Sequence, residues 1–304
     1  MFKDIISIKD LSKDEILAVL EKSEEMNELL LRGECLDMMK GKILATLFFE
    51  PSTRTKLSFS AAMHRLGGNV IDFGETRASS IAKGESLSDT LRMVEKYSDF
   101  IVIRHPKEGS AKFAAEISEK PVINGGDGSN EHPTQAIIDL FSIRKFKGQI
   151  KNLNVTLLGD LKHARVVKSL IYGLAIFNNI NITAVSPSGL ELEKEIVLDL
   201  EKNFGLKIFQ TNDIYGGIKN ADILYVTRIQ KERFSDIREA ERMQKSYKIT
   251  ADLLEQAKDN MIIMHALPRI DELDYDVDKT KFAKYFEEAA FGVPVRMAIL
   301  SLMK

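Results

Sequence analysis

Residues 48–59, FFEPSTRTKLSF, place an arginine between two threonines where an apolar run gives way to a helical pattern. Four polar residues open the expected helix: Ser52, Thr53, Arg54 and Thr55. A helix N-terminus carries unpaired backbone N–H groups and a partial positive charge, so it favours an anion. Helix capping would explain Ser52 alone. It would not explain Arg54, whose planar guanidinium suits a phosphate, or the second hydroxyl of Thr55. The segment predicts an anion site.

More polar residues follow the other apolar runs, where the carboxyl ends of parallel strands would lie. Ligands of open α/β sheets bind at these ends. The strand-end residues are Arg104, His105, Asn124, Asp127, Asn130, His132, Gln135, Asp160, Lys162, His163, Arg165, Thr227, Arg228, Gln230, His265, Leu267, Pro268 and Arg269. Any one of the five arginines in these loops, Arg54 included, is most simply a surface group. Together they indicate a crevice for a strongly anionic ligand.

Two further polar loops support this interpretation. SSIAKGES, residues 79–86, contains Lys83, which alone would be interpreted as a solvated side chain. HPTQ, residues 132–135, places Pro133 at a first helical position and sets His132 and Gln135 on one face of that helix start. His132 could cap the helix. Alternatively, it could donate to a bound carbonyl group and polarise it.

Several kinds of site are not expected. The segment at Arg54 lacks the spacing of a P-loop, and Leu158-Gly159-Asp160 does not open a dinucleotide-binding fingerprint. The histidines show no metal-ligand spacing, and no G-x-S-x-G elbow occurs. Cys35 is expected on an exposed, charged helix. We therefore expect no metal, no organic cofactor and no covalent nucleophile.

Short apolar runs alternate with helical patterns along the chain. The runs span residues 43–49, 100–103, 121–123, 154–158, 180–185, 223–226 and 261–264. This alternation predicts an α/β fold with two domains, each a mainly parallel sheet flanked by helices. We place the boundary in the helix after Pro133, which gives domains of residues 1–134 and 135–290 joined by interdomain helices. A C-terminal helix, about residues 291–304, is expected to pack back on the first domain.

Composition narrows the class of protein. The chain has 304 residues, 44% of them hydrophobic, which is enough for two well-packed cores. Lys and Arg number 43 against 45 Asp and Glu, so no nucleic-acid surface is indicated. One cysteine excludes a disulfide framework, and neither a signal peptide nor a membrane-spanning run is expected. We expect a cytoplasmic protein with small-molecule substrates, no nucleic acid and no membrane.

The motifs resemble those of the aspartate/ornithine carbamoyltransferase superfamily, and within it the aspartate carbamoyltransferase catalytic chains. They are F-x-E-P-S-T-R-T, S-S-x-x-K-G-E-S, Arg104-His105-Pro106, H-P-T-Q, TRIQKERF and Pro294-Val295-Arg296. The resemblance covers nearly the whole chain. It implies transfer of the carbamoyl group of carbamoyl phosphate to L-aspartate, which gives N-carbamoyl-L-aspartate and phosphate, the committed step of pyrimidine biosynthesis.

The resemblance also implies roles for residues that match the family's motifs. Carbamoyl phosphate would be held by Ser52, Thr53, Arg54, Thr55, Arg104, His132, Gln135 and the backbone at Leu267 and Pro268. Aspartate would be held by Arg165, Arg228, Gln230 and Lys83. Ser80 and Lys83 would reach the site of a neighbouring subunit, so the active unit would be a homotrimer with shared active sites. Arg54, Thr55, Lys83, Arg104 and His132 would be catalytic, without a metal. Regulatory chains or a dihydroorotase could join the assembly.

Two alternatives remain. Ornithine carbamoyltransferases share S-T-R-T but carry H-C-L-P and an S-M-G segment, whereas this chain has His265-Ala266-Leu267-Pro268 and no S-M-G. Arg165 and Arg228 favour a dicarboxylate over a cationic substrate. A non-catalytic family member acting as a binding subunit would need a broken site, but the matched residues are present. Two departures from the family pattern, Ala266 for proline and Ala164-Arg165-Val166 for G-R-T, predict altered affinity rather than lost activity.

Overall fold

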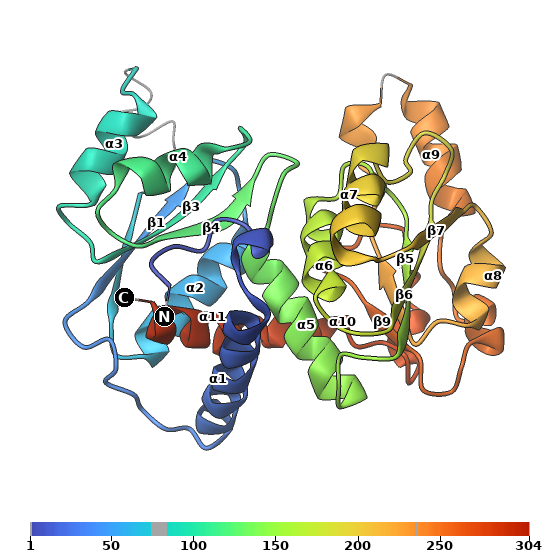
Figure 1. The fold of residues 1–304 in the computed structure, drawn as a ribbon, viewed down its shortest axis with the longest axis horizontal. Helices are drawn as coiled ribbons and strands as arrows, with labels where there is room; N and C mark the ends of the chain where they lie inside the picture. The colour runs from blue at the N-terminus through green and yellow to red at the C-terminus, as the bar shows by residue number, and fades with distance from the viewer. Residues whose placement is uncertain (1, 74–83, 235, 304) are drawn as a thin grey trace. The chain divides into compact units, whose positions relative to one another are not determined.

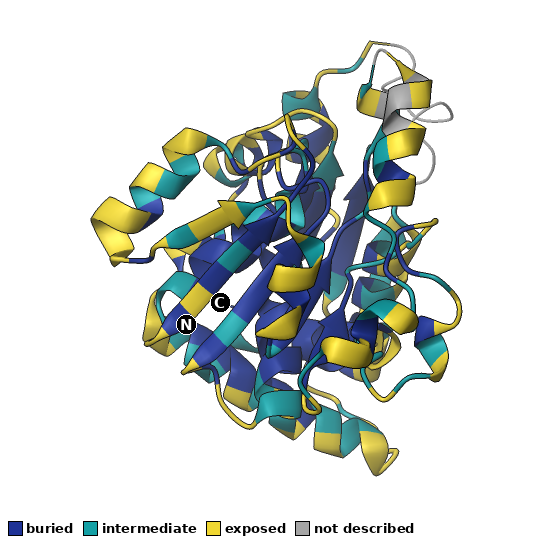
Figure 2. Cartoon of the chain, turned by 90° about the vertical axis from the view of Figure 1, so that its right-hand side faces the viewer, coloured by how far each residue is buried: buried dark blue, intermediate teal, exposed yellow. Residues whose placement is uncertain are grey.

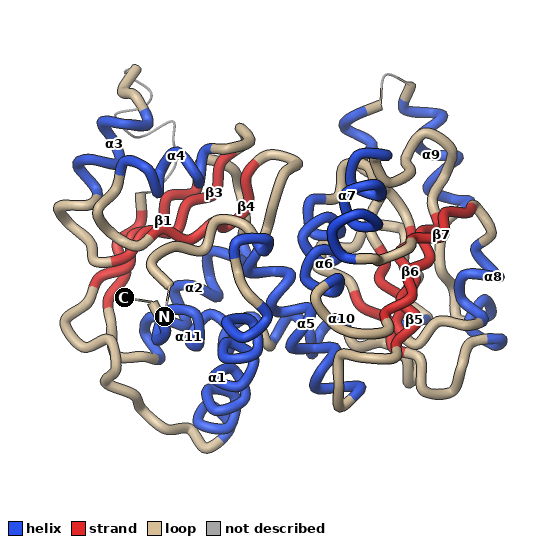
Figure 3. Tube along the Cα trace, viewed as in Figure 1, coloured by secondary structure: helices blue, strands red, loops and turns tan. Residues whose placement is uncertain are grey.

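The computed structural model describes residues 2–73, 84–234 and 236–303. Ser80 and Lys83 of the expected shared site lie outside the described residues. The chain divides into two compact units, one of residues 1–141 and 290–304 and the other of residues 142–289. Figure 1 colours the chain of both units from the N-terminus to the C-terminus, and Figure 3 colours their helices blue and their strands red. Among the described helices, none is both long enough and apolar enough to cross a membrane.

The first unit contains a parallel sheet of four strands in the order β2-β1-β3-β4. The strands are β1 (Ile43–Phe48), β2 (Asn69–Asp72), β3 (Phe100–His105) and β4 (Val122–Asp127). The chain goes from β1 outward to β2, and later from β3 outward to β4 in the opposite direction. The strand order therefore reverses between β1 and β3, and a crevice opens at their carboxyl ends in folds of this kind.

Helices cover both faces of this sheet (Figure 1). They are α1 (Lys13–Leu31), α2 (Thr53–Arg65), α3 (Leu87–Val94), α4 (Ser110–Ile117), the start of α5 (Pro133–Lys147) and α11 (Gly292–Leu302). Alternate strand residues such as Ala45, Leu47 and Ile101 pack with α3 and α4 in one buried cluster. Phe59, Ala62 and Met63 of α2 are buried on the other side. This two-sided burial explains why the inner strands are apolar throughout.

The C-terminal helix α11 belongs to the first unit. It packs against α1 and α2, and all of its residues from Gly292 to Leu300 except Val293 are buried. An isolated parallel bridge joins Phe2 to Met303. The first unit is therefore built from both ends of the described chain.

The second unit contains a parallel sheet of five strands in the order β7-β6-β5-β8-β9. The strands are β5 (Leu153–Leu158), β6 (Ile180–Val185), β7 (Ile208–Thr211), β8 (Ile223–Val226) and β9 (Ile262–Met264). The helices are α6 (Arg165–Ala175), α7 (Lys194–Phe204), α8 (Ile214–Lys219), α9 (Ile237–Ser246) and α10 (Tyr285–Ala290). Short 3-10 helices are η1 (Ile8–Asp10) in the first unit and η4 (Lys231–Arg233), η5 (Asp252–Gln256) and η6 (Val277–Lys279) in this one. The strand order reverses between β5 and β8.

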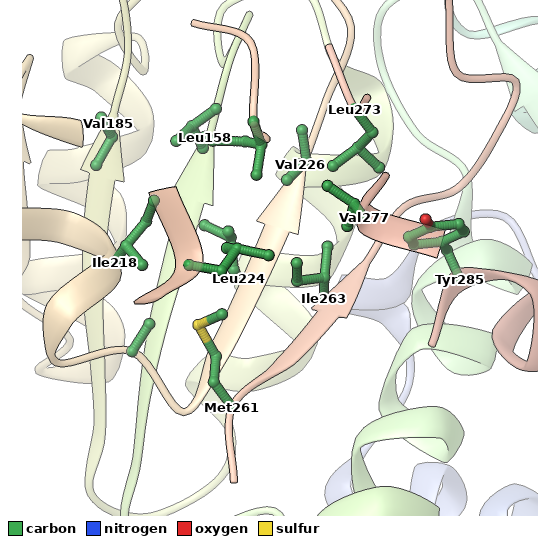
Figure 4. Close-up of a cluster of buried hydrophobic side chains, with 13 residues drawn as sticks. Leu158, Val185, Ile218, Leu224, Val226, Met261, Ile263, Leu273, Val277 and Tyr285 are labelled. Atoms are coloured by element: carbon green, nitrogen blue, oxygen red, sulfur yellow. The ribbon is translucent and has the colours of Figure 1, made fainter. Parts of the chain in front are cut away.

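One core of the second unit lies under α8 and the later loops. Figure 4 shows Leu158, Leu224 and Ile263 on neighbouring strands, with Ile218 and Tyr285 packed beside them. Figure 2 shows the same pattern of burial, with dark blue strands inside and exposed residues on outer helices and loops. Burial of this apolar surface is the main stabilising contribution to such a unit.

Two strands of the structure are absent from the sequence-based expectation. The edge strands β2 and β7 have intermediate and exposed residues, so neither forms an apolar run. The expected helical position of Cys35 is wrong, because α1 ends at Leu31 and Cys35 is exposed in the loop that follows. The prediction of an α/β fold with two parallel-sheet domains flanked by helices is confirmed.

Gly159 directly follows β5 and lies against Thr227, which follows β8. Its φ is +122°, and a Cβ there would lie 2.1 Å from the Thr227 carbonyl oxygen. We expect Gly159→Ala to lower the free energy of unfolding by about 3 kcal/mol, measured by urea denaturation.

The matched control for this change is Gly189→Ala. Gly189 also has a positive φ, +89°, but a Cβ there meets nothing within 4 Å. The control should lose only about 1 kcal/mol, the cost of the backbone conformation. Equal losses in the two variants would show that the contact with Thr227 is unimportant.

Candidate active site

The N-terminus of α2 lies at the reversal of strand order in the first sheet. Ser52 holds the N-cap position in extended backbone conformation, but its side chain makes no capping hydrogen bond. The first turn of α2 also contains no acidic residue. The Ser52 side chain therefore does not cap α2, and it accepts no hydrogen bond from the backbone N–H groups of the first turn. This helix start favours an anion.

Arg54 lies in this first turn. Arg54 is exposed, but the neighbouring protein removes part of its guanidinium from water and lowers its pKa. Among the residues that the structure describes, no carboxylate forms an ion pair with Arg54. A positive charge that is partly dehydrated and lacks a counter-charge is stabilised when an anion binds.

Arg104 ends β3 on the other side of the reversal. Its Nη2 donates to Glu50 at 2.7 Å and its Nη1 to the Gly125 carbonyl at 3.2 Å. Its side chain is largely buried, with 12% of its surface exposed. Glu50 is not among the expected site residues. An anion that binds Arg104 must share it with this carboxylate or replace it.

Thr55 of α2 and His132, which precedes α5, are neighbours in the structure. The Oγ1 of buried Thr55 lies 3.5 Å from the Nε2 of buried His132. His132 immediately precedes α5, and its carbonyl accepts from the backbone of Gln135 and Ala136. The structure therefore brings a hydroxyl and an imidazole together in the first unit. Two such donors could polarise a carbonyl oxygen.

Gln135, in the first turn of α5, is half-buried. Its Nε2 donates to the Oδ1 of Asp139 at 2.8 Å, and Asp139 is fully buried. Asp139 was not among the expected site residues. Its position four residues after Gln135 was the available signal, because residues four apart on a helix are neighbours.

In the second sheet, polar residues also follow the two strands on either side of the strand-order reversal. Fully buried Asp160 follows β5 and accepts from the backbone N–H of His163 at 3.0 Å. Thr227 follows β8, and its backbone N–H donates to the Leu158 carbonyl at 2.8 Å. The bond from Thr227 joins the ends of β5 and β8, whereas the bond from His163 orders the loop after β5.

Three of the four residues expected to bind aspartate follow these two strand ends. Arg165 begins α6 after β5, while Arg228 and Gln230 follow β8. The Oε1 of Gln230 accepts from the Nε of Arg233 at 3.0 Å. Arg165, Arg228 and Gln230 therefore follow the two strands on either side of the reversal, where ligands bind in folds of this kind, and their binding of aspartate stays a prediction. Ala164, where the family pattern has glycine, has a φ of −79°, so the alanine causes no strain there.

The loop after β9 contains Leu267 and Pro268, which the family resemblance assigns to carbamoyl phosphate. They belong to the second unit, whereas the other residues assigned to this ligand belong to the first, so that assignment stays a prediction. The Leu267-Pro268 peptide bond is cis, and Leu267 has a φ of +54°. The Leu267 N–H donates to His265 Nδ1 at 2.8 Å. The imidazole proton therefore lies on Nε2, which donates to Glu272 at 2.8 Å.

The pKa of Glu272 predicts a pH dependence of stability. Burial raises this pKa, but the hydrogen bond from His265 and the backbone N–H of Ile270 hold it below its ordinary value of 4.5. The ionised carboxylate therefore stabilises the fold above about pH 4.5, and this contribution is lost as the pH falls through the native pKa. We expect Glu272→Gln to be destabilising at pH 7, with the difference from the native chain shrinking below pH 4.5.

Urea denaturation at a series of pH values from neutral to acid measures this difference. The matched control is Glu255→Gln, since Glu255 is exposed on η5. The control should change stability little at any pH. A penalty for Glu272→Gln that stays constant down to the acid end would contradict the assignment of the charge to this carboxylate.

Arg269, the fifth strand-end arginine, has an intramolecular partner. Its Nη2 donates to Asp278 Oδ2 at 2.6 Å, and its Nη1 contacts the other carboxylate oxygen. The guanidinium also lies over the Tyr275 ring, 4.5 Å from the centroid. This pair and the ring contact account for Arg269 without a ligand.

Comparison with protein-family models gives one match in each half of the chain. Residues 3–145 match the carbamoyl-P binding domain of aspartate/ornithine carbamoyltransferase, and residues 151–303 match the Asp/Orn binding domain. The chain belongs to the aspartate/ornithine carbamoyltransferase family. The resemblance found from the motifs is therefore confirmed.

Individual members of the carbamoyltransferase family are similar to this chain over nearly their full lengths. The aspartate carbamoyltransferase catalytic subunit of Thermococcus kodakarensis is 52% identical over 300 residues, which cover 99% of this chain and 96% of the relative. The solved catalytic subunit of Methanocaldococcus jannaschii aspartate transcarbamoylase is 50% identical with a TM-score of 0.92, and the match covers 99% and 97% of the two chains. A Trypanosoma cruzi aspartate transcarbamoylase in complex with carbamoyl aspartate and phosphate is 38% identical with a TM-score of 0.94, covering 99% and 96%.

Proposed function

We propose that this chain is an aspartate carbamoyltransferase, which converts carbamoyl phosphate and L-aspartate into N-carbamoyl-L-aspartate and phosphate. One observation carries the proposal most directly: Arg54 has no carboxylate partner among the described residues and lies at an uncapped helix start where the strand order reverses. The relatives supply the reaction, because members 50% identical over nearly the whole chain are aspartate carbamoyltransferases.

We assign carbamoyl phosphate to the first unit. The phosphate would meet the N-terminus of α2 and Arg54, while Thr55, Arg104 and His132 would donate to the carbonyl oxygen. Ser52, Thr53 and Gln135 complete the set in this unit, and the backbone at Leu267 and Pro268 is assigned from the family pattern. Charge builds on the carbonyl oxygen when an amine attacks, and each donor aimed at it is worth about 3 kcal/mol.

We assign L-aspartate to the second unit, at Arg165, Arg228 and Gln230. Two guanidinium groups suit the two carboxylates of aspartate, whereas the cationic side chain of ornithine would be repelled by them. Lys83, the remaining residue assigned to aspartate, lies outside the described residues. The substrate amine must lose a proton to attack, and we propose that the departing phosphate accepts it.

The test is an incubation of the pure protein with carbamoyl phosphate and either aspartate or ornithine. We expect carbamoyl aspartate and phosphate to form in equal amounts with aspartate, and no product with ornithine. Citrulline formation would instead identify an ornithine carbamoyltransferase. Absence of both products would favour the non-catalytic binding subunit.

We further propose a homotrimer with shared active sites in the cytoplasm. The name catalytic subunit, which the relatives carry, supports an oligomer. The single cysteine, Cys35, is exposed and can form no disulfide within the chain, which supports a cytoplasmic location. Regulatory chains or a dihydroorotase are further partners that we propose for such a trimer.

Mixed assemblies test the sharing of sites. Lys83→Ala and Arg54→Ala chains, each nearly inactive alone, should recover activity when they are dissociated and reassembled together, because some sites would receive neither change. In a random mixture of equal parts, about a quarter of the sites would be intact, since the two contributing chains are drawn independently. Native mass spectrometry confirms mixing. Mixed trimers without activity would disprove shared sites.

A further inference from the structure

The amide of Gln135 is held in one orientation by a buried carboxylate. Nε2 of Gln135 lies 2.8 Å from Oδ1 of Asp139, and Asp139 is fully buried. An ionised carboxylate can only accept hydrogen bonds, so the amide must turn its NH₂ group toward Asp139. Its carbonyl oxygen Oε1 then points to the other side of the amide. Within the described part of the chain, this oxygen accepts no hydrogen bond.

A buried arginine lies close enough to Asp139 for the two charges to interact. Arg296 of α11 has 3% of its surface exposed, and its guanidinium lies over the Phe59 ring at 4.8 Å from the centroid. Its Nη1 donates to the Gly292 carbonyl at 3.3 Å. Burial, followed by the nearby charge of Arg104, lowers the pKa of Arg296 to about 9, and the charge of Asp139 opposes this shift. At neutral pH the arginine is thus a cation that electrostatically favours the carboxylate form of Asp139.

We propose that Asp139, supported by Arg296, is a positioning residue that makes Gln135 a selective acceptor for the NH₂ group of carbamoyl phosphate. With its own NH₂ group committed to Asp139, Gln135 can offer only Oε1 to a ligand. An acyl phosphate with an N–H donor satisfies that oxygen, whereas acetyl phosphate presents a methyl group of similar size and leaves it unpaired. This inference rests on the proposed function and specifies how one substrate is selected.

The energetic reason is an asymmetry in hydrogen bonding. Leaving a partly buried acceptor without a donor costs about 1–3 kcal/mol, which corresponds to roughly 5- to 150-fold in affinity. An amide free to rotate avoids most of this cost, because it can turn its NH₂ edge or its oxygen toward the ligand. Selection against the methyl analogue therefore depends on Asp139 even though Asp139 itself touches no substrate.

The experiment compares the affinities of carbamoyl phosphate and acetyl phosphate in the intact enzyme. The discrimination is the inhibition constant of acetyl phosphate divided by the dissociation constant of carbamoyl phosphate. Asp139→Asn keeps the shape but allows the Gln135 amide to rotate, and should reduce this discrimination about ten-fold. Gln135→Met removes the acceptor while leaving Asp139 in place, and should reduce it by a similar factor.

The double variant separates positioning from a general structural effect. If Asp139 acts through Gln135, Asp139→Asn should reduce the discrimination no further in the Gln135→Met background. Unchanged discrimination in Gln135→Met, or a further ten-fold reduction in the double variant, would overturn the inference. The Gln135→Met result decides the matter if Asp139→Asn fails to fold. A native enzyme that forms no carbamoyl aspartate would refute the proposed function instead.

Discussion

Replacing Arg54 by alanine should lower kcat about 1,000-fold while changing aspartate binding little. Arg54 lies at the start of α2, and no described carboxylate pairs with it, so the phosphate would be its main electrostatic partner. Phosphate gains negative charge as the carbamoyl group leaves, and a cation beside it acts more strongly in the transition state than in the ground state. Loss of one such group costs about 10²–10³ in kcat in comparable sites, and the full charge of Arg54 places it at the upper end.

Steady-state kinetics with both substrates varied measures the Arg54→Ala effect. The control is Arg65→Ala, which makes the same chemical change in the exposed last turn of the same helix. Arg65→Ala should leave kcat within two-fold, as about ±0.5 kcal/mol is usual for surface changes. A normal kcat in Arg54→Ala would show that the phosphate does not bind at the α2 N-terminus.

Replacing Arg228 by alanine should raise the aspartate KM about 50-fold and change kcat less. Arg228 follows β8 at the strand-order reversal of the second sheet, opposite the strand end that leads to Arg165. A charge-assisted pair between arginine and carboxylate contributes about 1.5–3 kcal/mol, and aspartate makes this contact before and during the reaction. Uniform binding of this kind appears in KM rather than in kcat.

The control for this change is Arg242→Ala, because Arg242 is exposed on α9 of the same unit. It should leave the aspartate KM unchanged. The Arg54→Ala and Arg228→Ala enzymes should therefore differ in which kinetic parameter they change. If both showed the same profile, the assignment of one arginine to each substrate would be wrong.

The inner strands could be predicted from sequence because they are buried on both faces. β5 and β8 form apolar runs, and the polar residues that follow them, such as Arg165 and Arg228, could be assigned to strand ends. β2 and β7 could not be predicted in this way. They lie at sheet edges and are partly exposed, so their side chains need not be apolar.

The supporting charges of the site were also beyond sequence reasoning. Asp139 and Arg296 lie more than 150 positions apart, and their charges interact only because α11 returns to the first unit. Each looks like an ordinary polar residue on an otherwise buried helix. Arg269 shows the opposite error, since its strand-end position resembled that of Arg54 although Asp278 already binds it. Tertiary contacts decide which charges are available to a ligand.

The return of α11 has a consequence for biosynthesis. Residues 142–289 form a contiguous unit that can fold as soon as they leave the ribosome, whereas the earlier residues lack the helix that covers α1 and α2. The first unit thus cannot complete its folding before residues 292–302 are translated. Until then the apolar faces of α1 and α2 stay uncovered, so a nascent chain paused before this point would be a natural client for a chaperone.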